Sequence, residues 1–205
     1  VESFMDELAQ AAECDPVQFR LRHLQDERAR AVIEAAAEKA NWQPRTHPAE
    51  KGNGRGIAFA QYKNIQCYAA VIVELSVDRE NNEIKLQRAI IAADAGQIVN
   101  PDGLSNQLEG GFFQSASWTL EEQVTFDQKG ITSQDWDSYP SLRFSGAPVI
   151  EVILLNRPDQ PFLGSGEATQ GPTPAAIANA VYDATGLRLR KLPLSQALRN
   201  ATLKG

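Results

Sequence analysis

The sequence has little cysteine, little histidine and no excess of basic residues. Its 205 residues include two cysteines, Cys14 and Cys67, and two histidines, His23 and His47. Two cysteines are too few for a disulfide framework, and the four residues do not have the spacing of a zinc site. Lys and Arg together number 20 against 26 Asp and Glu, so the formal net charge is −6. Because nucleic-acid binding needs a basic surface, we expect no nucleic-acid partner.

Long hydrophobic runs are also missing. No apolar run approaches the roughly 20 residues that a membrane-spanning helix needs, so we expect no transmembrane segment. Hydrophobic residues make up 42% and charged residues 22%, which is ordinary for a globular protein with a buried core. The chain begins Val1-Glu2-Ser3 without an initiator Met, so we expect a piece cut from a larger polypeptide. The compartment, cytoplasmic or periplasmic, stays open.

The first 42 residues have helical patterns. Ser3 with Asp6 resembles a capping box, and Asp15 before Pro16 is typical of the start of a second helix. A third helix is expected at about 27–40. Residues 43–55 are rich in Pro and Gly and are predicted to be a linker. The expected division is therefore a helical segment 1–42, the linker 43–55 and an α+β subdomain 56–205.

The subdomain is predicted to mix strands and helices without strict alternation, which indicates the α+β class. The charges of Arg188, Arg190 and Lys191 fit the solvated face of an edge strand. The helices are expected at 101–118, 175–185 and 194–203. The strands are expected at 56–62, 68–77, 84–94, 122–127, 149–156 and 187–192, with a hairpin turn at Asn81 and Asn82.

The sequence LGSGEATQGP at 163–172 is the first candidate site. Its glycines allow a ligand to approach the backbone, and the helix that follows offers free N–H groups to an anion. Glu167, among small neighbours, has the character of a general base. The spacing does not fit a dinucleotide-binding fingerprint. The alternative is a plain glycine turn whose Glu167 faces water.

The helix at 101–118 carries the second candidate site. One side of it is apolar, whereas Gln107, Gly111 and Gln114 form a separate face at i, i+4 and i+7. Gly110 and Gly111 each cost about 1 kcal/mol in a helix relative to Ala, so close approach of another backbone or of a cofactor is expected to compensate. The alternative is tight helix–sheet packing with Gln107 on the surface.

Other catalytic chemistries have less support. Ser165 has no sequence-local base, and neither histidine belongs to a motif, which argues against a nucleophilic serine or cysteine. A carboxylate-based hydrolase would need Glu167 paired with Asp94 or Glu109, and no spacing places two acids across one substrate bond.

Four motifs in order resemble the molybdenum hydroxylases, the xanthine dehydrogenase and aldehyde oxidase superfamily. The chain is similar to the C-terminal part of their large, molybdopterin-binding subunit, closest to bacterial isoquinoline 1-oxidoreductase beta-subunit-like proteins. The resemblance covers nearly the whole chain. The motifs are MDELA (5–9) with DPVQFR (15–20); AGQIVNP (95–101) with QLEGG (107–111); WDSY (136–139) with Arg143, AP (147–148) and IE (150–151); and GSGE (164–167) with PAAIANA (174–180) and ATG (184–186).

The resemblance implies a mixed sheet with packed helices, as a fragment of a larger subunit, and a role for each site residue. Glu167 would be the base that deprotonates the hydroxyl on molybdenum as an electron-poor carbon is attacked. Gln107 would hydrogen-bond the cofactor near the metal. Amides at two glycine clusters would help to seat the pterin or its dinucleotide tail: Gly110, Gly111, Gly164, Ser165 and Gly166.

The resemblance also implies the cofactor and the partners. The cofactor would be molybdenum–molybdopterin cytosine dinucleotide, and the substrate an N-heterocycle or aldehyde hydroxylated with oxygen from water. Electrons would pass to a small 2Fe–2S subunit. The N-terminal part of the large subunit is needed as well, so the isolated chain is expected to be inactive. Residues 168–171 depart from the family pattern by separating Glu167 from Pro172. The alternative is a non-catalytic scaffold or interaction domain that retains the fold.

Overall fold

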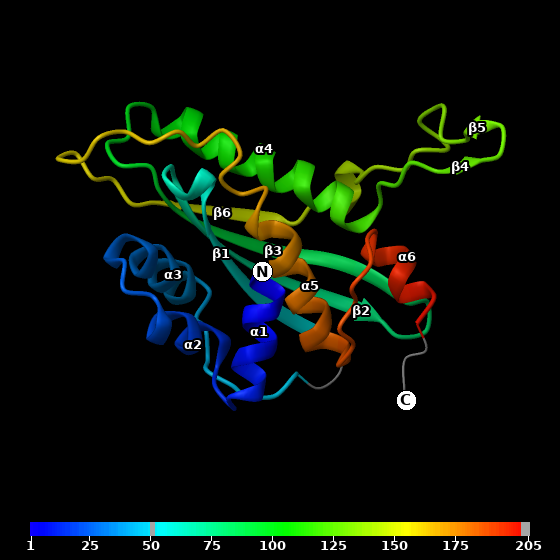
Figure 1. Ribbon diagram of the computed structural model, residues 1–205, viewed down its shortest axis with the longest axis horizontal. Helices are drawn as coiled ribbons and strands as arrows, with labels where there is room; N and C mark the ends of the chain where they lie inside the picture. Colours follow the sequence, from blue (N-terminus) through cyan, green and yellow to red (C-terminus); the bar gives the residue numbers. More distant parts are fainter. Residues whose placement is uncertain (50–51, 202–205) are drawn as a thin grey trace.

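A four-stranded mixed sheet forms the centre of the protein (Figure 1). The computed structural model describes residues 1–49 and 52–201. The strand order is β1-β2-β3-β6, with β1 at Asn53–Gln61, β2 at Tyr68–Asp78, β3 at Glu83–Asp94 and β6 at Val149–Leu154. The first three strands are antiparallel, and β6 joins β3 in parallel. The parallel pairing requires a long crossover connection, which contains α4.

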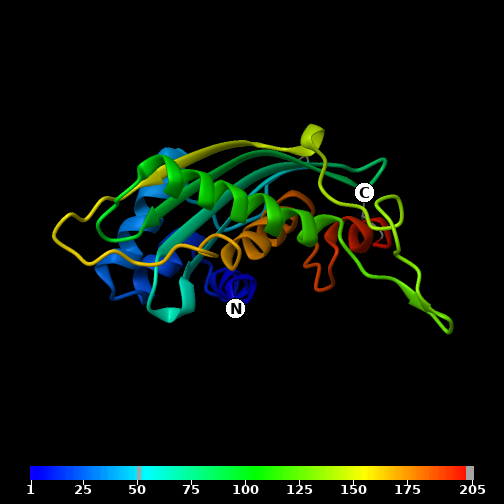
Figure 2. The same ribbon diagram turned by 90° about the horizontal axis from the view of Figure 1, so that it is seen from above.

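Helices cover both faces of the sheet. The alternation of β2 sends Val71, Val73 and Leu75 into one core and Ala70 and Ile72 into the other. The first core is closed by α4 (Pro101–Leu120), α5 (Pro172–Thr185) and α6 (Leu194–Arg199), and the second by α2 (Pro16–His23) and α3 (Glu27–Lys39). In the views of Figures 1 and 2, α4 runs along the length of the sheet. The α+β class is confirmed.

Two glycines of β1 allow α5 to pack closely on the sheet. A Cβ at Gly54 would lie 2.0 Å from the carbonyl oxygen of Ala180, and one at Gly56 would lie 2.3 Å from that of Ala176. Any side chain at either position would force the helix away from the strand. Residues 53–55 are predicted to be linker, but β1 begins at Asn53, so the end of that segment belongs to the sheet.

The N-terminal helices are bounded largely as predicted. The Asp15 carboxylate accepts hydrogen bonds from the N–H groups of Val17 and Gln18 and so caps α2. The predicted capping box of Ser3 with Asp6 is wrong, because α1 (Glu2–Ala11) begins before Ser3 and has no side-chain cap. Asp6 pairs instead with Arg20 of α2. Residues of α2 and α3 share a core with the sheet. The division of the chain into a helical segment 1–42, a linker 43–55 and a subdomain 56–205 stays a prediction.

Two predicted strands differ from the structure. Residues 187–192 form no strand, because Leu187 and Leu189 pack against the core and the Arg188 guanidinium lies over the ring of Tyr182. Arg188 is therefore not part of a solvated strand face. The strand expected at 122–127 is reduced to β4 (Phe126–Asp127), which pairs with β5 (Gly130–Ile131). Residues 202 and 203 of the predicted last helix lie outside the described residues.

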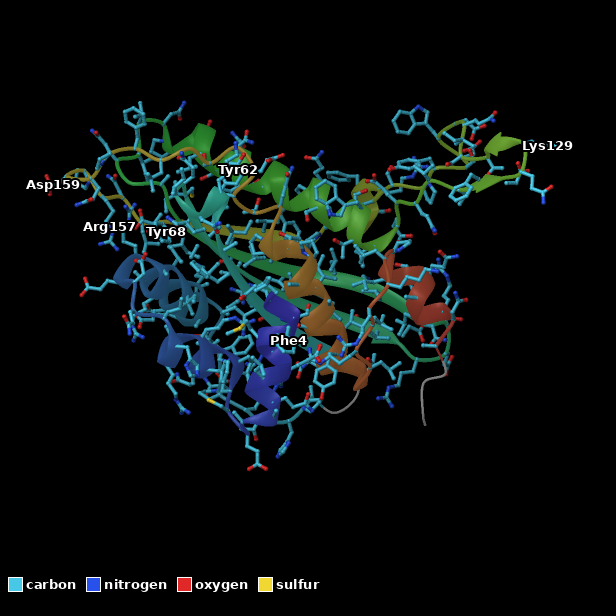
Figure 3. All side chains as sticks on the ribbon, in the orientation of Figure 1. Phe4, Tyr62, Tyr68, Lys129, Arg157 and Asp159 are labelled. Atoms are coloured by element: carbon cyan, nitrogen blue, oxygen red, sulfur yellow. The ribbon has the colours of Figure 1, made fainter. Side chains whose placement is uncertain are left out.

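The segment 122–139, here called the arm, extends away from the sheet (Figures 1 and 3). It contains β4 and β5 and carries exposed apolar side chains, among them Phe126 and Trp136, each 78% exposed. Nearby, Phe144 is 98% exposed. In residues 1–49 and 52–201, no helix combines the length and the apolar character needed to cross a membrane.

Candidate functional site

The glycine loop (residues 163–171) leads into α5 and is held by the turn after β3, by the turn between β1 and β2, and by α4. The N–H of Leu163 donates to the carbonyl of Ala95 at 2.7 Å, in the turn after β3. Gly164 is bound on both sides, because its N–H donates to Gln66 Oε1 at 2.6 Å and its carbonyl accepts from the N–H of Cys67 at 3.1 Å. These contacts place the loop at the end of the sheet, beside α4.

Helix α4 presents its predicted polar face to this loop. Gln107 Nε2 donates to the carbonyl of Gly166 at 2.6 Å. A Cβ at Gly111 would lie 2.5 Å from Thr169 Oγ1, and Gln114 accepts a hydrogen bond from Gln170. The structure thus brings the two candidate sites together. Gly111 is explained by packing, although against the loop rather than the sheet. Gly110 faces open space.

Glu167 is exposed on the loop, and its Oε2 accepts a hydrogen bond from the hydroxyl of Tyr62 at 3.1 Å. Tyr62 begins η1 (Tyr62–Asn64), the short 3-10 turn after β1. No signal in the sequence pointed to Tyr62 or Gln66, because their partners lie about 100 residues further along the chain. Within this chain the Glu167 carboxylate therefore faces outward, available to a group bound beside the loop.

Asp94, at the end of β3, binds the turn that contacts the glycine loop. Its carboxylate is fully buried and accepts hydrogen bonds from Arg28, from Arg157 and from the N–H of Gly96 at 2.9 Å. Burial acts to raise the pKa of Asp94, but these donors outweigh it and hold the pKa below its ordinary value. A carboxylate enclosed by two arginines is not free to act on a substrate, which removes Asp94 from the hydrolase alternative.

Cys67 lies under the glycine loop as a core thiol, as expected. It is fully buried, and burial raises the pKa of the thiol to about 12. The thiol therefore stays protonated near neutral pH and is not a nucleophile. Across the described ranges, no group of three His, Cys, Asp or Glu residues has an arrangement that could hold a metal ion.

A pocket of about 270 Å³ adjoins the glycine loop. It lies between the turn after β3, the first turns of α4 and the loop, and its lining includes Gln97, Asn100, Gln107, Phe162 and Ser165. In residues 52–201, no hydrogen bond uses the N–H of Ser165 or of Gly166. Unused amides, a glutamine and an exposed carboxylate beside one pocket fit one wall of a site for a polar ligand.

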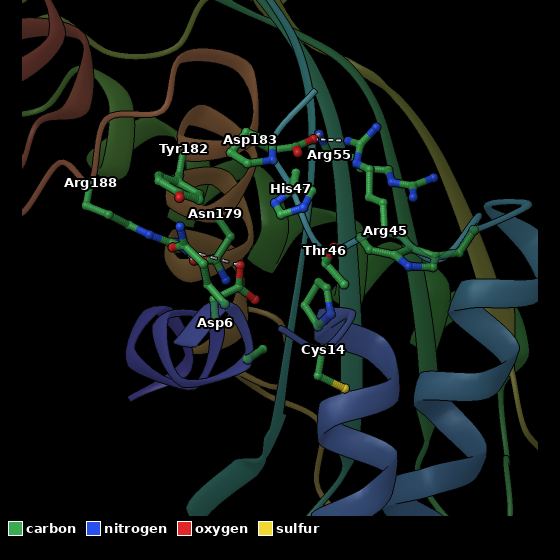
Figure 4. A pocket seen from close by; sticks show the side chains of 15 residues that line it. Asp6, Cys14, Arg45, Thr46, His47, Arg55, Asn179, Tyr182, Asp183 and Arg188 are labelled. Atoms are coloured by element: carbon green, nitrogen blue, oxygen red, sulfur yellow. Dashed lines mark hydrogen bonds and ion pairs between the residues drawn. The ribbon is translucent and has the colours of Figure 1, made fainter. Parts of the chain in front are cut away.

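A second pocket, of about 50 Å³, lies between α1 and α5 (Figure 4). Arg45 pairs with Asp183, whereas Arg188 donates to the amide oxygen of Asn179 and lies 3.7 Å from the carboxylate of Asp6. Asp183 also accepts from the N–H of Arg55 at 2.8 Å, which ties the start of β1 to α5. The contacts with Asp183 join Arg45, Ala49 and Arg55 to α5. The Nε atoms of Arg55 and Arg188 are buried and have no hydrogen-bond partner within the described residues.

The fold and this site define a class of protein. The chain belongs to the family of molybdopterin cofactor-binding domains, whose match covers residues 2–148. Its relatives include one of the subunits of nicotinate dehydrogenase from Pseudomonas putida, 43% identical over an alignment that covers all of this chain and 18% of that protein. The beta subunit of isoquinoline 1-oxidoreductase from Brevundimonas diminuta is 34% identical, again over all of this chain and 26% of that protein.

A solved structure shows the same fold. Quinoline 2-oxidoreductase from Pseudomonas putida superposes with a TM-score of 0.62 and 21% identity, over 66% of this chain and 18% of that chain. The family match and the two relatives confirm the resemblance to the xanthine dehydrogenase and aldehyde oxidase superfamily, and the superposition confirms the fold. The family match ends before the glycine loop, whereas the two relatives align across it. The chain spans only 18% and 26% of the length of those relatives.

Proposed function

We propose that this chain is the C-terminal part of a molybdenum hydroxylase large subunit and that Glu167 is the base at its molybdenum centre. The observation that carries the proposal is the placement of an exposed Glu167 on a glycine loop that contacts Gln107 of α4 beside a pocket. The family membership indicates a molybdopterin cofactor. Glu167 is the only carboxylate among residues 163–171.

Each residue at the proposed cofactor site has a separate role. When bound, the molybdenum cofactor supplies the oxidising centre and activates water-derived oxygen. Glu167 would act as the general base that accepts a proton at its carboxylate. Gln107 uses its Nε2 on Gly166, which leaves its Oε1 to accept a hydrogen bond from the cofactor. The N–H groups of Ser165 and Gly166, which no hydrogen bond within residues 52–201 uses, would donate to anionic groups of the cofactor.

The remaining glycines have separate roles in the proposal. Gly110 faces open space and allows a cofactor to approach the backbone of α4. Gly111 and Gly164 act indirectly, because Gly111 admits Thr169 against the helix and both backbone groups of Gly164 are bound within the chain. They shape the wall of the site without touching the cofactor themselves.

The substrate is proposed to be an N-heterocycle, with an aldehyde as the second choice. Nicotinate and isoquinoline, named in the two relatives, are both N-heterocycles with electron-poor carbons. The cofactor form is proposed to be molybdopterin cytosine dinucleotide, and the electron acceptor a small 2Fe–2S subunit. Because this chain supplies one wall of the site, the N-terminal part of the large subunit is the further partner, and the chain alone is expected to be inactive.

The test uses the complete enzyme. Glu167→Gln keeps the shape of the side chain and removes the base, so turnover is expected to fall by at least ~100-fold while molybdenum per subunit is retained. Glu109→Gln, a carboxylate on α4, is the matched control and is expected to keep turnover. Substantial activity in Glu167→Gln would sink the assignment of the base.

A scaffold that retains the fold without catalysis is the second candidate. It is separated by measuring molybdenum per chain and the cytidine nucleotide released by acid from the complete protein. Near-stoichiometric metal with cytidine nucleotide supports the hydroxylase and its dinucleotide cofactor. Absence of both, in a host that loads other molybdenum enzymes, supports the scaffold.

A further inference from the structure

The turn between β1 and β2 (residues 62–67) packs directly on the glycine loop. Two backbone hydrogen bonds close this turn, from the N–H of Tyr62 to the carbonyl of Cys67 at 2.9 Å and from the N–H of Gln66 to the carbonyl of Tyr62 at 2.8 Å. Lys63 and Asn64 have left-handed φ values of 51° and 60°. Such a conformation persists only where the surrounding contacts hold it, which is common at functional sites.

This turn contacts the loop at two points. At the first point, Gln66 and Cys67 hold the backbone of Gly164. At the second point, Tyr62 reaches the side chain of Glu167, with its hydroxyl 3.1 Å from Oε2 (Figure 3 labels Tyr62 at this end of the sheet). The first contact fixes where the loop lies, whereas the second fixes how one carboxylate is oriented.

The Tyr62 hydroxyl is the one hydrogen-bond donor that reaches the Glu167 carboxylate within residues 1–49 and 52–201. The groups that approach the loop from other elements are neutral: Gln107 from α4 and Gln66 from the turn. The charged group of the turn, Lys63, has its Nζ 5.3 Å from the centre of the Tyr62 ring. Removing the hydroxyl would therefore leave Glu167 without any partner in this part of the chain.

We propose that Tyr62 is a positioning residue that holds Glu167 in the orientation needed for proton abstraction. By engaging Oε2, the hydroxyl restricts rotation of the carboxylate and leaves Oε1 available to a bound group. This inference rests on the proposed role of Glu167 as the base. The sequence shows no motif at Tyr62, and the resemblance assigns it no role.

The experiment is Tyr62→Phe in the complete, metal-loaded enzyme. We expect kcat to fall about 10-fold, because a misplaced base costs rate without weakening substrate binding. KM and molybdenum per subunit are expected to stay within about twofold of wild type, because the phenyl ring still fills the same space. Tyr139→Phe is the matched control, since it removes a hydroxyl–carboxylate hydrogen bond to Glu122 in the arm, away from the site.

Amide hydrogen exchange over residues 164–167 separates positioning from loop structure. Tyr62→Phe is expected to leave exchange there unchanged, since Gln66 and Cys67 still hold Gly164. Gln66→Ala is expected to accelerate it. An unchanged kcat in Tyr62→Phe, or a fall accompanied by metal loss or faster exchange, would overturn the inference. Full turnover in Glu167→Gln would instead overturn the proposed base, so the two failures are distinguishable.

Discussion

At the scale of single residues, a buried charge next to the site is stabilised by ion pairs within the protein rather than by solvent. Asp94 has no contact with solvent, yet it is bound by two guanidinium groups that are themselves partly exposed. The two arginines come from α3 and from the segment after β6, so one carboxylate joins three distant parts of the chain. Its hydrogen bond to Gly96 also fixes the turn that contacts Leu163.

The substitution Asp94→Asn tests this arrangement. Removing one charge of a buried ion pair is expected to lower the free energy of unfolding by about 3 kcal/mol at neutral pH. Because the pKa of Asp94 is lowered in the folded state, its stabilisation is present above the ordinary value of 3.8 and is lost as the pH falls through the lower folded value. Denaturant unfolding at several pH values measures both effects.

Asp159→Asn is the control for Asp94→Asn, since Asp159 is an exposed acid in the neighbouring loop. It is expected to change the free energy of unfolding by less than about 0.5 kcal/mol. If the two variants were equally stable at neutral pH, the Asp94 cluster would not have the structural role assigned to it.

At the scale of elements, adjacent glycines of α4 are expected to respond in opposite directions. Gly110 faces open space, so Gly110→Ala should stabilise the helix by about 0.5–1 kcal/mol. At Gly111 a Cβ would lie 2.5 Å from Thr169 Oγ1, so Gly111→Ala should destabilise the protein by about 1–3 kcal/mol. Thermal unfolding of the two variants side by side checks this, and equal shifts in Tm would contradict the packing.

The pairing of α1 with α2 is a second test at this scale. Arg20 is 2% exposed and is bound by Glu2, Asp6 and the carbonyl of Ile57 in the edge strand β1. Burial raises the pKa of Asp6, although the positive charge of Arg20 acts to lower it. Arg20→Ala would remove the guanidinium shared by two acids, leaving Glu2 with the N–H of Phe59 and Asp6 with Arg188 at 3.7 Å. It should cost about 3 kcal/mol in denaturant unfolding.

The control for Arg20→Ala lies two residues further along the same helix. Arg22 is exposed, and Arg22→Ala should change stability by less than about 0.5 kcal/mol. A similar loss in both variants would mean that helix propensity, rather than the buried ion pairs, explains the effect.

The elements also show how far sequence reasoning reached. The face formed by Gln107, Gly111 and Gln114 follows from helical periodicity alone, and it meets the glycine loop. The strand at 187–192 was predicted from alternation, but Leu187 and Leu189 pack on the core without strand pairing. Tyr62 could not be found, because its contact with Glu167 depends on how β1 and the segment after β6 come together in space.

At the scale of the whole molecule, the exposed side chains of the arm indicate an interaction surface. The chain spans 18% of one relative and 26% of another, and its most exposed aromatic side chains gather on and near the arm. Apolar side chains grouped in this way mark an interaction surface. The acidic net charge of −6 gives no separate reason for the chain to self-associate.

The last prediction concerns residues 1–205 produced separately from any further sequence. The arm should then drive concentration-dependent self-association, measured by sedimentation velocity, because its apolar side chains are exposed within residues 1–49 and 52–201. Phe126→Ser with Trp136→Ser should reduce this association, since both side chains are 78% exposed. Lys129→Ser, at the polar tip of the arm, should leave it unchanged. A chain that is monomeric at every concentration, or one that associates equally in both variants, would contradict the assignment of the arm as an interaction surface.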